Sequence, residues 1–78
     1  MSKNEKLSKA IRNNPKGVRF DDAVKMAKLL GFDHKGGQSS HRAFAREGEP
    51  KLLNFQDRKG FIVPYQARQL IEMMDKYE

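Results

Sequence analysis

The residue best suited to acid–base chemistry in this sequence is His41, which follows Ser39 and Ser40 in a segment expected to form a strand. An imidazole has an unperturbed pKa of about 6.5, so a histidine can exchange a proton at neutral pH. On RNA, such a group could take the proton of a ribose 2′-hydroxyl or give one to the leaving 5′-oxygen. A surface histidine without chemistry is the alternative, and the residues alone leave it open.

Other chemistry is not expected at this segment. Successive side chains of a strand point to opposite faces, which would place Ser40 across the sheet from His41 and make it a poor nucleophile for a histidine base. Ser39 would share the face of His41, but no acidic residue close in sequence orients the imidazole, so a serine-hydrolase triad is not expected. Because His34 and His41 are the only histidines and cysteine is absent, neither a metal site nor a cofactor is expected.

Basic residues flank the expected strands and could contact RNA phosphates: Lys35, Arg42, Arg46, Lys51, Arg58 and Lys59. Gly37, in a turn with Gly36, would let a phosphate approach the backbone closely. For each basic side chain, a solvated surface position is the alternative. The formal net charge of +6 favours a polyanionic partner, although six of the 16 basic residues lie within residues 1–19.

The spacing of apolar residues predicts three helices and three strands. Helices are expected over residues 5–12, from an N-cap at Asp21 or Asp22 to about Leu30, and from Pro64 onward. Gly31 stands where a C′ glycine would end the second helix. Strands are expected over residues 32–35, 39–46 and 51–55, and their short connections favour an antiparallel sheet.

These elements indicate one α+β domain over residues 1–78, with a basic N-terminal helix and linker (1–19) before an αβββα body (20–78). The two helices of the body would cover one face of the sheet and leave the other open. Phe44 has a large apolar side chain and is expected beneath the helices, which would place His41 on the open face.

Length and composition argue against other settings. No apolar run approaches the roughly 18 residues that span a bilayer, and residues 1–14 lack the apolar segment of a secretory signal. The absence of cysteine fits a reducing compartment. The sequence therefore predicts a cytoplasmic protein without a membrane partner.

Taken in order, the chain resembles the HicA-type toxins, the mRNA-cleaving components of bacterial toxin–antitoxin systems. The resemblance spans residues 14–20, 30–32, 52–55 and 64–69, together with Phe44, Arg46 and the segment Gly37-Gln38-Ser39-Ser40-His41. Two positions depart from the family pattern. Ser39 stands where glycine is usual, and Arg42 where a second histidine is common.

The resemblance implies an αβββα fold similar to a double-stranded RNA-binding domain and a metal-independent endoribonuclease that inhibits translation and growth. His41 would be the catalytic residue, and Ser40 matches the serine of the family motif. Expected RNA contacts are at Lys35, Gly37, Ser39, Ser40, Arg42 and Arg46. The implied partners are mRNA and a HicB-type antitoxin protein. A non-catalytic RNA-binding module and a domain that binds an acidic protein are the alternatives.

Overall fold

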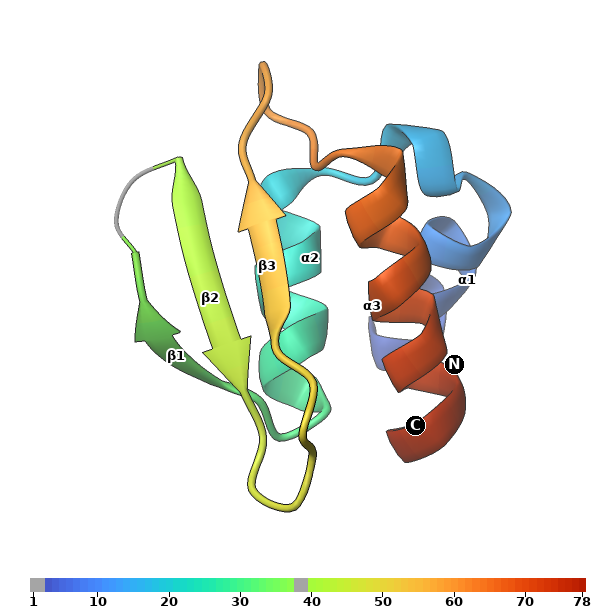
Figure 1. Ribbon diagram of the computed structural model, residues 1–78. Coiled ribbons are helices and arrows are strands. Elements are labelled where there is room, and N and C mark those ends of the chain that lie inside the picture. The colour runs from blue at the N-terminus through green and yellow to red at the C-terminus, as the bar shows by residue number, and fades with distance from the viewer. Residues whose placement is uncertain (1–2, 38–39) are drawn as a thin grey trace.

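The computed structural model describes residues 3–37 and 40–78, which form three α-helices, a short 3₁₀ helix and a three-stranded antiparallel sheet (Figure 1). In chain order the elements are α1 (Lys3–Asn13), η1 (Pro15–Gly17), α2 (Phe20–Leu29), β1 (Asp33–Gly36), β2 (His41–Ala45), β3 (Leu53–Gln56) and α3 (Pro64–Tyr77). The expected α+β class, with a three-stranded antiparallel sheet and an additional N-terminal helix, is confirmed.

The sheet has the order β1-β2-β3, so β2 lies in its centre (Figure 1). On one face Phe44 of β2 is fully buried and pairs with Leu53 of β3, and α2 lies behind these strands in Figure 1. On the other face His41 pairs with Gln56 and is exposed. The expected register is therefore confirmed, because the large apolar ring is the side chain that gains most from burial.

Three phenylalanines form the centre of the core. Phe32, Phe44 and Phe55 are each at most 1% exposed, and the ring centroids of Phe44 and Phe55 lie 5.6 Å apart. Burial of each such ring contributes about 1.5–3 kcal/mol. The N-terminal segment belongs to the same core, since Ile11 of α1 and Val18 after η1 are also buried in it.

The ends of α2 differ in how well the sequence predicts them. The helix begins at Phe20, whose backbone N–H donates to the carbonyl of Gly60 at 2.9 Å, so the expected N-cap at Asp21 or Asp22 is wrong. Both carboxylates lie instead in the first turn, where negative charge stabilises the helix dipole. At the other end Gly31 confirms the C′ prediction, with its N–H bonded to Lys28.

The strands are shorter than expected or displaced along the chain. β1 and β3 begin one and two residues later than the apolar pattern predicts, because Phe32 and Leu52 belong to connections. β2 begins at His41, and Ser40 forms part of a turn before it. Of the residues expected at the start of this strand, Ser39 lies outside the described residues.

Glu49 anchors the connection between β2 and β3 to the end of α3. Its buried carboxylate accepts hydrogen bonds from Lys76 Nζ at 2.7 Å, from the Tyr77 hydroxyl at 2.6 Å and from the backbone N–H of Lys51 at 3.0 Å. These donors favour the charged form and lower the pKa of Glu49 from 4.5 to about 2. The hairpin end is therefore fixed to the helix layer.

A second ionic cluster joins α1 to α3. Arg12 contacts Asp75 at 2.6 Å and Glu78 at 3.0 Å, and Ser8 also donates to Glu78. Both carboxylates raise the pKa of the Arg12 guanidinium. Within the described residues, no helix is long and apolar enough to cross a membrane.

Candidate nucleic-acid site on the open sheet face

An open groove crosses the sheet at the end where β1 finishes and β2 begins. It has a volume of about 180 Å³, and residues from all three strands and α3 line it: Gly36, Gly37, His41, Arg42, Ala43, Asn54, Phe55 and Gln66. The groove therefore brings the expected acid–base residue together with polar side chains that are 13 and 25 positions away in sequence.

His41 stands at the first position of β2, with its side chain exposed. The Ser40 hydroxyl oxygen lies 3.4 Å from Nδ1 of His41, whereas Nε2 has no hydrogen-bond partner among the described residues. The expectation that Ser40 lies across the sheet from His41 is wrong, because Ser40 is in a turn and strand alternation does not apply to it. In the tautomer where Nδ1–H donates to Ser40, Nε2 is a free proton acceptor.

Gly37 sets how closely β1 can approach this histidine. Its φ is +84°, in the left-handed region, and a Cβ there would collide with the carbonyl oxygen of His41. A residue with a side chain would thus have to push the start of β2 away. Gly37 packs against the His41 backbone, so it positions the histidine within the groove.

The groove also contains two amides that sequence reasoning did not select. Asn54 pairs with Ala43 and is exposed on the open face. Gln66 reaches the groove from the first turn of α3, and its Oε1 accepts hydrogen bonds from the N–H of Gln56 at 2.9 Å and of Val63 at 3.4 Å. The only sequence signal for Gln66 was its place in the 64–69 segment of the family resemblance.

A projecting loop over residues 57–61 adjoins the His41 end of β2. The N–H of Asp57 donates to the carbonyl of Ser40 at 2.7 Å, and Arg58 and Phe61 pair their backbones at 2.7 and 3.0 Å. The Asp57 carboxylate accepts the N–H of Gly60 at 2.7 Å and closes the turn. The sequence indicates only a polar loop here, whereas in the structure these hydrogen bonds hold residues 57–61 beside His41.

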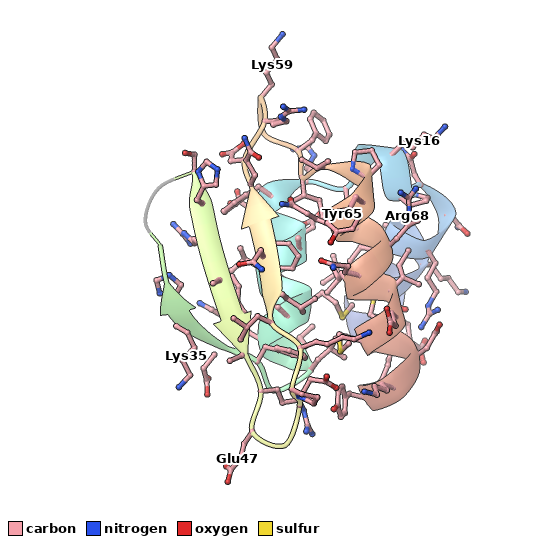
Figure 2. All side chains as sticks on the ribbon, viewed as in Figure 1. Lys16, Lys35, Glu47, Lys59, Tyr65 and Arg68 are labelled. Atoms are coloured by element: carbon pink, nitrogen blue, oxygen red, sulfur yellow. The ribbon has the colours of Figure 1, made fainter. Side chains whose placement is uncertain are left out.

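The basic residues expected to bind RNA do not all gather at the groove. Arg42 lines it, with its guanidinium carbon 5.4 Å from the centroid of the Phe20 ring. Lys35 is exposed at an irregularity of β1, between the paired residues His34 and Gly36, and Figure 2 shows it at the side edge of the sheet. It does not line the groove.

Arg46 lies at the other end of β2 and is occupied by structural contacts. Its Nε donates to the carbonyl of Leu30 at 2.9 Å, and its guanidinium carbon lies 3.9 Å from the centroid of the Tyr77 ring. A further bond reaches the carbonyl of Glu47 at 3.3 Å. These contacts tie the end of α2 to the hairpin and to α3, away from His41.

The second histidine, His34, contacts the chain that leads to Gly37 and the core. Its Nε2 lies 3.0 Å from the carbonyl oxygen of Gly37, and its ring packs on Phe44 with centroids 5.6 Å apart. Among residues 3–37 and 40–78, no three His, Cys, Asp or Glu side chains gather in a way that could hold a metal ion.

Comparisons with protein-family models, with curated proteins and with solved structures find no match for this chain.

Proposed function

We propose that this chain is a metal-independent endoribonuclease of the HicA type, with a fold similar to a double-stranded RNA-binding domain, acting on mRNA in the cytoplasm. The observation that carries the proposal is an exposed histidine, His41, in an open groove at one end of the sheet, with Nε2 unbonded among the described residues. An RNA strand can reach such a groove without any rearrangement of the core.

In the proposed reaction, Nε2 of His41 takes the proton from a ribose 2′-hydroxyl, and the 2′-oxygen attacks the adjacent phosphorus. The bond between phosphorus and the 5′-oxygen breaks, its electron pair leaves with that oxygen, and water supplies the proton. The products carry a 2′,3′-cyclic phosphate and a 5′-hydroxyl. The Asn54 amide, which lines the groove and pairs with Ala43 on the face of His41, would stabilise charge developing on the phosphoryl oxygens, whereas the Arg42 side chain lies over Phe20 of α2.

Replacement of the histidine tests the catalytic role. Loss of a general base typically lowers the rate about 10²–10⁴-fold, so we expect His41→Ala to lose RNA cleavage by a factor in that range. The measurement is the initial rate of cleavage of an end-labelled RNA, resolved on a denaturing gel, with EDTA present to remove divalent ions.

The matched control is His34→Gln, which replaces the histidine outside the groove and keeps a donor for the Gly37 carbonyl. This variant should cleave at the parental rate. Cleavage by His41→Ala at the rate of the parent would rule out His41 as the base.

A non-catalytic RNA-binding module is the second candidate. It is favoured by one feature of the groove: His41 is the only histidine among its lining residues, so no second imidazole is present to protonate the leaving oxygen. This candidate predicts salt-dependent binding of RNA that stays intact in the cleavage assay.

We also propose an acidic HicB-type antitoxin as the protein partner, one that covers the groove. The proposal rests on the net charge of +6 and on the accessibility of His41. Expression of the chain alone should arrest growth, and co-expression of the product of the adjacent gene should restore it. Growth arrest that requires neither RNA cleavage nor His41 would contradict this account.

A further inference from the structure

The end of the molecule beyond the groove carries an exposed set of cations and aromatic rings. Figure 2 shows Lys59, Tyr65, Arg68 and Lys16 along this end, whereas Glu47 marks the opposite one. Phe61 and Tyr65 on this end are 41% and 59% exposed. We call this set the loop–helix surface; its members are Lys16, Arg19, Arg58, Lys59, Phe61, Tyr65 and Arg68.

Backbone contacts hold the parts of this surface together. Arg19 and Phe61 form an antiparallel bridge, and the N–H of Ile62 donates to the carbonyl of Val18 at 2.9 Å. The 57–61 loop is therefore held between the chain that leads into α2 and the Ser40 turn. Tyr65 lies in the first turn of α3 and directly precedes Gln66, which lines the groove.

The three ion-paired cations of the described residues all lie outside this surface. Lys51, Lys76 and Arg12 are all neutralised by carboxylates. By contrast, no side chain of the five surface cations forms an ion pair or a hydrogen bond within residues 3–37 and 40–78. The acidic residues within segments 16–22 and 57–68, which contain the surface, are Asp21, Asp22 and Asp57, and Asp57 accepts the N–H of Gly60. The surface is thus left with unpaired positive charge.

The pairing of exposed rings with unpaired cations matches single-stranded nucleic acid. Bases stack on aromatic faces while Lys and Arg contact the phosphates between them. An acidic protein would use the cations but would not need two exposed rings among them. The hydroxyl of Tyr65 accepts a hydrogen bond from Gln69 at 3.0 Å, which fixes the orientation of its ring.

We propose that a single RNA strand continues from the groove onto the loop–helix surface, where Tyr65 and Phe61 stack bases and Arg58, Lys59 and Arg68 hold phosphates. This inference rests on the proposed function for the identity of the ligand as RNA. It adds that nucleotides outside the reacting one supply much of the affinity, and that the substrate is single-stranded at these positions.

The test measures the binding of fluorescein-labelled 2′-O-methyl oligonucleotides of about 4 and about 12 residues by anisotropy, lengths within the range that single-stranded sites occupy. The 2′-O-methyl group removes the nucleophile, so binding is measured without cleavage. Loss of one stacked base costs about 1–3 kcal/mol, so Tyr65→Ala should raise the Kd of the 12-mer about 5–150-fold. The Kd of the 4-mer should change little.

Two variants separate stacking from other effects. Tyr65→Phe keeps the ring and should bind the 12-mer nearly as the parent does. Leu52→Ala removes a comparably exposed apolar side chain from the connection between β2 and β3 and should leave both Kd values unchanged.

The phosphate contacts are tested by salt dependence. Each phosphate contact to a single strand contributes about 0.7 to the slope of log Kd against log salt. The double variant Arg58→Ala/Lys59→Ala should lower that slope by about 1.4 for the 12-mer, while Lys28→Ala at the far end of α2 should not.

The outcomes are distinct from those of the cleavage assay. Equal Kd values for the parent and Tyr65→Ala on the 12-mer, or equal losses on the two lengths, would overturn the inference while leaving His41 catalysis standing. An acidic protein that binds through these cations without competing with the 12-mer would also overturn it. Binding without cleavage by the parent would instead overturn the nuclease proposal and leave the surface intact.

Discussion

At the scale of single residues, the site depends on where His41 is held as well as on its chemistry. Its Nδ1 lies 3.4 Å from the Ser40 hydroxyl, and Gly37 packs against its backbone with no space for a side chain. The sequence predicts the position of this histidine, because burial of Phe44 places His41 on the opposite, open face of the strand. Strand alternation does not predict the contact between the Ser40 hydroxyl and the His41 ring, because Ser40 lies in a turn before the strand.

The close approach at Gly37 gives a test with a matched control. Gly37 and Gly48 have φ values of +84° and +86°, so alanine at either position incurs the same left-handed strain of about 1–2 kcal/mol. Only at Gly37 would the new Cβ also meet the carbonyl of His41, whereas nothing lies within 4 Å at Gly48.

We expect Gly37→Ala to lower the free energy of unfolding by more than Gly48→Ala does, and to reduce RNA cleavage as well. Gly48→Ala should lose stability but keep cleavage. Urea unfolding and the cleavage assay measure the two effects. Equal stability loss and equal activity in the two variants would show that Gly37 does not position the histidine.

At the scale of the elements, apolar spacing predicts the three α-helices and the three strands but not their ends, nor the short helix η1. Phe44 fixed which face of β2 is buried, and Pro64 marked the start of α3. The ends depend on partners distant in sequence. α2 starts at Phe20 because of a bond to Gly60, and the connection after β2 is fixed by Glu49 against α3. Periodicity contains no information on such contacts.

The Glu49 anchor predicts a defined pH dependence. Its pKa is lowered to about 2 in the folded protein, from an ordinary 4.5, so its stabilising contribution is complete above about pH 4.5 and is lost as the pH falls toward 2. Glu49→Gln should therefore lower the Tm at pH 7, and the difference from the parent should shrink between pH 4.5 and 2.

Thermal unfolding followed by circular dichroism across this pH range measures the effect. The control is Glu72→Gln, which removes an exposed ion pair with Lys51 that contributes at most about 1 kcal/mol. A Tm difference for Glu49→Gln that stays constant from pH 7 to pH 2 would contradict the role of the carboxylate charge.

At the scale of the whole molecule, the ion-paired cations of the described residues lie outside the loop–helix surface. Near the C-terminus Arg12 and Lys76 are neutralised by carboxylates, while the loop–helix surface keeps its charge free among the described residues. The net charge of +6 and the excess in residues 1–19 did not predict this division, because both count charges without their partners. Ile11 is buried in the common core, so the basic N-terminal helix α1 packs on the body of the domain. The sequence indicates only that this helix precedes the αβββα body.

The fold leaves a groove open beside His41, and the central claim is that this histidine acts as the base in RNA cleavage. The most direct measurement is the cleavage rate of one end-labelled RNA by the parent and by His41→Ala in EDTA, with the product ends identified. We predict cleavage by the parent that leaves a 2′,3′-cyclic phosphate, and a rate about 10²–10⁴-fold lower for the variant. Equal rates for the two proteins, or intact RNA with both, would contradict the account.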